Sequence, residues 1–92
     1  LDLITKALDL KPESAAILDS MGWVNYRLGN LEEAAKYLQR ALSQQNDDEI
    51  AAHLGEVLWM MGKKVQARSI WAKALEDFPD SDKLADVLGR FK

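Results

Sequence analysis

The sequence predicts an all-α protein in which antiparallel helix pairs stack side by side as a solenoid. Three observations support this prediction. A shift of 33 residues places Gly22 on Gly55 and Gly29 on Gly62, and a period of 33–34 residues continues along the chain. Within each period the apolar residues recur at helical spacing. A glycine follows each first helical stretch, at a position where glycine commonly ends a helix.

Composition restricts what the chain can bind. Its 92 residues allow one domain at most, and 12 basic against 15 acidic side chains give a net charge of −3. The two signs are interspersed along the chain, so the clustered basic face that binds nucleic acid is missing. Without cysteine, neither disulfides nor thiolate metal sites can form. The longest strongly apolar run, residues 57–61, is too short for direct membrane insertion.

Each repeat is expected to start with a helix that carries one apolar stripe. Gly29 and Gly62 end these helices, and Asn30 is expected to cap the helix that follows. Glu33, three residues further on, completes a capping-box pattern. The stripe residues are Ile17, Leu18, Met21, Val24 and Leu28 in one repeat, and Ile50, Ala51, Leu54, Val57, Leu58 and Met61 in the next.

The second helix of each repeat packs through small and large residues in the same register. Asp47-Asp48 and Asp80-Ser81 are candidate N-caps for the helices that come after them. The packing residues are Ala34, Leu38, Ala41 and Leu42, and their copies 33 residues later are Ala67, Trp71, Ala74 and Leu75.

Gly22 and Gly55 lie inside predicted helices, where glycine costs about 1 kcal/mol relative to alanine. A close crossing of the two helices of a pair would explain why a residue without bulk recurs there. Ala34 and Ala67 are expected on the facing side of this contact, and Trp71 is expected in the core.

These residues resemble the motif of the tetratricopeptide repeat (TPR) family. The resemblance implies a right-handed superhelix of about six helices in a single TPR domain fragment, residues 1–92. Residues 1–14 would be the second half of a truncated repeat, 15–47 and 48–81 two full repeats, and 82–92 a capping helix or the first helix of a further repeat. The matching positions are Leu18, Met21-Gly22, Asn25, Ala34, Leu38 and Asn46, then Ala51, Leu54-Gly55, Leu58, Ala67, Trp71 and Pro79.

In the proteins that this sequence resembles, a second stripe on the first helices lines a concave groove that holds a peptide. Large aromatic residues there are typical binding anchors. The alternative is that these aromatic side chains pack against neighbouring helices inside the solenoid. The candidate groove residues are Asp19, Trp23, Tyr26, Arg27, His53, Glu56, Trp59 and Met60.

No pattern in the sequence indicates catalysis, a metal or a cofactor. His53 is the single histidine and there is no cysteine, which makes a metal site improbable. A general base needs a nucleophile or a partner carboxylate in a closed pocket, and nothing in the sequence marks one. The prediction is therefore a chain that is not an enzyme.

The sequence predicts a protein- or peptide-binding scaffold whose ligand is apolar and weakly basic. The alternative is a structural segment that extends or caps a longer TPR array and associates with a second copy through an exposed first helix (Leu3, Ile4 and Leu8). The strings "DSMGWVNYRLG" and "EIAAHLGEVLWMMG" are similar to the last repeats of TPR-containing lipoproteins of the proteobacterial cell envelope. That resemblance implies an adaptor in the bacterial periplasm, with the cytoplasm as the alternative.

Overall fold

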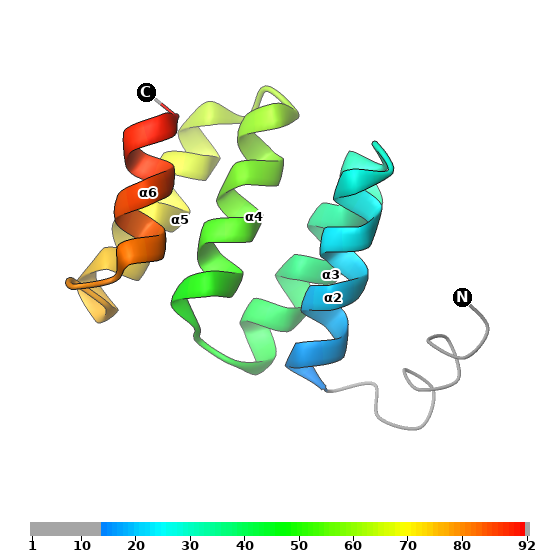
Figure 1. Cartoon of the computed structure of the whole chain (residues 1–92), viewed down its shortest axis with the longest axis horizontal. Helices are drawn as coiled ribbons and strands as arrows, with labels where there is room; N and C mark the ends of the chain where they lie inside the picture. Colours follow the sequence, from blue (N-terminus) through cyan, green and yellow to red (C-terminus); the bar gives the residue numbers. More distant parts are fainter. Residues whose placement is uncertain (1–13, 92) are drawn as a thin grey trace.

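The computed structural model describes residues 14–91, which form five helices (Figure 1). No strand occurs between residues 14 and 91, so the predicted all-helical fold class is confirmed. The helix expected at the start of the chain, with Leu3, Ile4 and Leu8, lies outside the described residues. The helices are α2 (Ala15–Arg27), α3 (Leu31–Gln44), α4 (Asp48–Met60), α5 (Lys64–Asp77) and α6 (Asp82–Arg90).

Side-chain caps begin the helices α2, α4 and α6. Asp47 accepts hydrogen bonds from the backbone N–H groups of Glu49 (2.9 Å) and Ile50 (3.1 Å), and Ser81 accepts one from Leu84 (3.2 Å). Ser14 occupies the same position ahead of α2. These oxygens satisfy N–H groups that have no partner within the helix. The predicted caps at Asp47 and Ser81 are thus confirmed.

Two glycines end the helices α2 and α4 in the same way. Gly29 (φ +87°) and Gly62 (φ +86°) adopt the left-handed conformation that glycine tolerates best. At the first turn, the Asn30 N–H donates to the Asn25 carbonyl (2.8 Å), and Gly29 donates to Tyr26 (3.0 Å), which is a Schellman motif. The bonds from Lys63 to Leu58 and from Gly62 to Trp59 repeat it.

The capping box predicted at Asn30 and Glu33 is wrong. Asn30 does precede α3, but its side chain caps no backbone N–H and instead donates to Asn25 Oδ1 (3.3 Å). Glu33 pairs with Lys36 (3.4 Å). The physical reason is that the end of α2 already holds Asn30 through both its backbone and its side chain.

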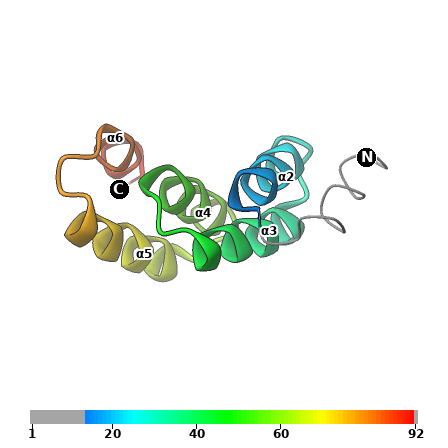
Figure 2. The same ribbon diagram turned by 90° about the horizontal axis from the view of Figure 1, so that it is seen from below.

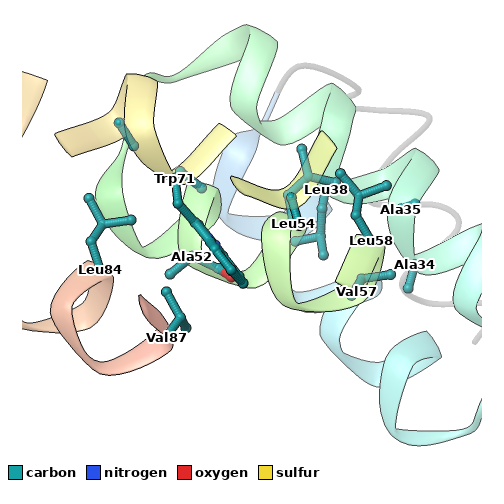
Figure 3. Packing of buried hydrophobic residues seen from close by; sticks show 13 residues of the cluster. Ala34, Ala35, Leu38, Ala52, Leu54, Val57, Leu58, Trp71, Leu84 and Val87 are labelled. Atoms are coloured by element: carbon teal, nitrogen blue, oxygen red, sulfur yellow. The ribbon is translucent and has the colours of Figure 1, made fainter. Parts of the chain in front are cut away.

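The helices form two layers. Figure 2 shows α2, α4 and α6 side by side in one layer and α3 and α5 in the other, so that each short turn connects the layers. The core lies between them (Figure 3). Trp71 of α5 is fully buried, as predicted, and its indole lies between α4 and the α6 residues Leu84 and Val87. Burial of so large an apolar side chain stabilises the stack.

The close crossings predicted at Gly22 and Gly55 are present, but large side chains fill them. A Cβ built on Gly22 would lie 2.6 Å from Leu38 Cγ, and one on Gly55 would collide with the Trp71 indole. Ala34 and Ala67 are fully buried nearby. The large residue of the next helix is therefore the nearest neighbour of each glycine. At Gly22 the expected alanine shares the contact, since the Ala34 carbonyl oxygen would lie 3.2 Å from the added Cβ, whereas at Gly55 the three nearest atoms all belong to Trp71.

The apolar stripe predicted on the first helix is buried only in part. Leu18 and Met21 are buried, whereas Val24 is 43% and Leu28 is 68% exposed. The difference arises because no helix within residues 14–91 packs on the side of α2 that faces away from α4. None of the helices in the described part of the chain is long and apolar enough to cross a bilayer.

Candidate functional site: the concave face of helices α2, α4 and α6

The layer formed by α2, α4 and α6 carries an open cavity of about 400 Å³ on its outer side. Figure 2 shows α4 set back between α2 and α6, which makes this face of the solenoid concave. The cavity and its walls are called the concave face below. Its lining residues are Trp23 from α2, then Glu49, Ala52, His53 and Glu56 from α4, and Asp82, Lys83, Asp86, Val87 and Arg90 from α6.

The repeat places corresponding residues next to one another across this face. A shift of 33 and then 34 residues carries Trp23 to Glu56 and then to Arg90. In the structure Arg90 donates to Glu56, its counterpart one repeat earlier (3.1 Å). Lys83 and Glu49, a second pair 34 residues apart, are 2.7 Å apart. Stacking equivalent helices side by side therefore converts a period in the sequence into contacts between repeats.

Trp23 of α2 and His53 of α4 form an aromatic wall on the α2 side of the concave face. Their rings stack with centroids 4.1 Å apart, and the Tyr26 ring also lies against Trp23, with centroids 4.9 Å apart. The His53 Nδ1 is 3.0 Å from Asp19 Oδ1, a contact that joins α4 to α2. Trp23 is partly exposed. Asp19 thus fixes the imidazole on which the Trp23 ring rests.

Glu56 is a buried carboxylate that joins three helices. Only 7% of the residue is exposed, and its two oxygens accept hydrogen bonds from the Tyr26 hydroxyl (2.8 Å) and from Arg90 (3.1 Å). Burial, reinforced by the hydrogen bond to Glu56, raises the pKa of Tyr26 to about 12. A buried carboxylate needs such partners, since burying it unpaired costs several kcal/mol. This network holds α2, α4 and α6 in one arrangement.

The two cations of the concave face are also paired. Arg90 Nε donates to Asp86 (3.0 Å) in addition to its bond to Glu56. Lys83 binds Glu49, and this hydrogen bond raises the pKa of the Lys83 ammonium group above its ordinary value. The face therefore carries cations, but each is held by a carboxylate of the same face.

The predicted groove residues separate into two sets. Trp23, His53 and Glu56 line the cavity, and Asp19 and Tyr26 support them from α2. The other three predicted groove residues, Arg27, Trp59 and Met60, do not line it.

Trp59 lies at the far end of α4, where its ring centroid is 5.9 Å from that of Trp71 and 5.8 Å from that of Phe91. Lys64 and Arg68 each approach its face at 5.1 Å. This is the packing alternative considered for the aromatic residues. A binding role for Trp59 stays a prediction.

Sequence reasoning missed the contribution of α6. It placed no residue of this helix among the candidate groove residues, but Asp82, Lys83, Asp86 and Arg90 all line the cavity. The repeat period could have indicated this contribution of α6, because Lys83 and Arg90 fall 34 residues after Glu49 and Glu56 and carry the opposite charge. Within residues 14–91 no group of three or more histidine or acidic side chains could hold a metal ion.

Comparison with known proteins places this fold in a family. The tetratricopeptide repeat family profile matches residues 25–91, and the chain belongs to that family. Tetratricopeptide repeats generally serve as scaffolds for interactions between proteins.

Two curated proteins are similar in sequence. TPR repeat-containing protein PA4667 of Pseudomonas aeruginosa is 58% identical over 55 residues, which cover 60% of this chain and 9% of that protein. The human protein O-mannosyl-transferase TMTC1 is 33% identical over 95 residues, covering 98% of this chain and 11% of that protein. The chain thus spans about a tenth of the length of these relatives.

Proposed function

We propose that this chain is a non-enzymatic binding module whose concave face holds an extended or helical segment of a partner protein. The observation that supports it most is the cavity of about 400 Å³ with a partly exposed tryptophan, Trp23, in its wall. Tryptophan is among the residues that contribute most to binding energy at interfaces. The family's general role in protein interaction agrees with this proposal.

Several side chains of the concave face are already held in place without a ligand. The Tyr26–Glu56–Arg90 network links all three helices, and the Asp19–His53 contact fixes the stacked pair of rings. A partner would therefore not have to order these side chains. Less conformational entropy is lost on binding to such a surface, which favours affinity.

A second function has support from a different surface. Val24 and Leu28 expose apolar side chains on the side of α2 that faces away from α4, and an exposed apolar patch often marks a contact surface. Such a contact would make the chain a structural segment of a longer array or of an assembly of identical copies. Leu28 does not line the cavity, so the two functions can be tested separately.

A peptide selection tests the proposed function. A library of random dodecapeptides displayed on phage is selected on the 92-residue chain, and the enriched peptides are synthesised with blocked termini. Their binding is mapped by changes in amide chemical shifts. We expect the shifts to concentrate on α2, α4 and α6, and we expect Trp23→Ser to weaken binding about tenfold or more.

Leu28→Ser is the matched control, because it changes an exposed large apolar residue next to the end of the same helix. It should leave peptide binding unchanged. Peptides that bind mainly to α3 and α5, or that tolerate Trp23→Ser, would contradict the proposed function. Sedimentation of the parent and of Leu28→Ser tests the second function, which predicts a dimer that this variant dissociates.

A further inference from the structure

The concave face has an excess of acidic groups. Four carboxylates line it, Glu49, Glu56, Asp82 and Asp86, against the two cations Lys83 and Arg90. With His53 neutral, the formal charge of the lining is −2. Asp19, which supports His53, adds a further carboxylate beside it.

Both cations are already paired with carboxylates of the same face. Lys83 Nζ lies 2.7 Å from Glu49, and Arg90 is shared between Asp86 (3.0 Å) and Glu56 (3.1 Å). A carboxylate of a ligand would compete with these protein carboxylates for the cations, and displacing one would leave an acid of the protein without its partner. Removal of Arg90 from Glu56 would be especially unfavourable, because that carboxylate is buried.

Acidic groups do remain available on α6. Asp82 forms no ion pair with another residue between 14 and 91, and the Asp86 side chain is 62% exposed although it contacts Arg90. The two residues are four positions apart on α6, so they lie on the same side of the helix. A cation of a ligand placed there gains a partner without displacing any existing contact.

The apolar part of the face lies opposite these acids. The Trp23 ring, stacked on His53, forms one wall, while Ala52 of α4 and Val87 of α6 contribute small apolar surfaces to the lining. Both Ala52 and Val87 belong to the buried core and cannot move away. A bound segment thus meets an aromatic wall on the α2 side and carboxylates on the α6 side.

We propose that the concave face selects a basic apolar segment, in which a lysine or arginine sits close to a large apolar side chain, and that it rejects acidic segments and free carboxyl termini. This inference rests on the proposed function, since it names the chemistry of the segment that the same face binds. The apolar side chain lies against Trp23, and the cation lies between Asp82 and Asp86. Electrostatic complementarity sets the preference between partners, while the apolar contact supplies most of the affinity.

The dodecapeptides selected above provide the test. The relevant group is the peptides whose binding is lost in Trp23→Ser. We expect this group to be enriched in lysine and arginine next to aromatic or large aliphatic residues, and depleted of aspartate and glutamate. Its affinity should fall as salt rises, because salt screens exposed charges.

A pair of double variants locates the cation. Asp82→Asn with Asp86→Asn removes two negative charges from the concave face. Asp80→Asn with Glu76→Gln removes two exposed charges that do not line it. The first should weaken the selected peptides about three- to tenfold, in line with the strength of exposed charge pairs, and the second should have almost no effect.

The outcomes separate this inference from the proposed function. Peptides that need Trp23 but are neutral or acidic would overturn the inference and leave the proposed function standing. Equal weakening of binding by both double variants would overturn it as well, because only overall charge would then matter. A selection that yields no peptide dependent on Trp23 would overturn the proposed function itself.

Discussion

Three glycines at the same position of successive repeats give a matched test of how closely the helices pack. Gly22 and Gly55 lie within α2 and α4, and Gly89 is their counterpart in α6. The same substitution, glycine to alanine, adds one methyl group at each. The surroundings of that methyl group differ most between the sites, although Gly89 lies near the end of α6 and Gly22 and Gly55 lie in helix interiors. Comparing the three variants therefore separates most of the packing effect from that of helix propensity.

The structure predicts a different result at each site. Propensity alone favours alanine by about 1 kcal/mol in a helix interior. At Gly89 nothing lies within 4 Å of the added Cβ, so the variant should be stabilised by up to about 1 kcal/mol. At Gly22 the Cβ would lie 2.6 Å from Leu38 Cγ and 3.2 Å from the Ala34 carbonyl oxygen. Overpacking of this kind costs about 1–3 kcal/mol, which leaves a net loss of about 0–2 kcal/mol.

Gly55→Ala should be the most destabilising of the three. The added Cβ would collide with the Trp71 indole at Nε1 and Cε2 and would lie 2.7 Å from Cδ1. Trp71 is fully buried, and its Nε1 donates to the Ala52 carbonyl (3.4 Å), so the ring has no free space into which it can turn. We expect an overpacking cost near the upper end of that range, which leaves a net loss of about 2 kcal/mol after the propensity gain.

Urea denaturation followed by circular dichroism measures all three variants against the parent. The expected order of midpoints is Gly89→Ala highest, then the parent, then Gly22→Ala, with Gly55→Ala lowest. Comparable slopes with denaturant would show that the same structure unfolds in each case. A midpoint for Gly55→Ala at or above that of Gly89→Ala would refute the close packing of α4 against Trp71.

Two other predictions concern the core and the charge network. Trp71→Ala should lower the free energy of unfolding by about 3–5 kcal/mol, measured by the same denaturation experiment, because it empties the centre of the core. Tyr26 should make stability fall as the pH rises from about 10 to about 12, because the unfolded chain loses the phenol proton near pH 10 while the folded chain keeps it to about 12. Tyr26→Phe should flatten that fall. A tyrosinate absorbance titration of the parent and of Tyr26→Phe should assign the high pKa to Tyr26. A pH profile of stability that is unchanged in Tyr26→Phe would contradict the Tyr26–Glu56 contact.

The fold could be predicted because the relevant signals are local or periodic. Gly29 and Gly62 follow apolar helical stripes, and their left-handed conformation is a requirement of the turn itself. Asp47 and Ser81 act as caps through bonds to backbone groups two or three residues away. The capping box failed at Asn30 for an equally local reason, since the preceding turn uses the same residue.

The candidate site could be predicted only in part, because its chemistry depends on contacts between repeats. The second stripe correctly indicated that Trp23, His53 and Glu56 share a face. It identified Glu56 only as a member of that face, whereas the carboxylate is buried and bound by Tyr26 and Arg90. Tyr26, a candidate groove residue, therefore also stabilises the fold, because its hydroxyl satisfies a buried charge.

The sequence by itself determined the repeat, the helix boundaries and the family resemblance, since these depend on the order and spacing of residues along one chain. Only the tertiary structure decided which charges of the concave face are paired and which remain available. Lys83 is neutralised by Glu49, and Arg90 by Asp86 and Glu56, while Asp82 is left facing the cavity without such a partner among residues 14–91. The physical reason is that the strength of a charge pair depends on distance and burial, and both are set when α4 and α6 pack side by side.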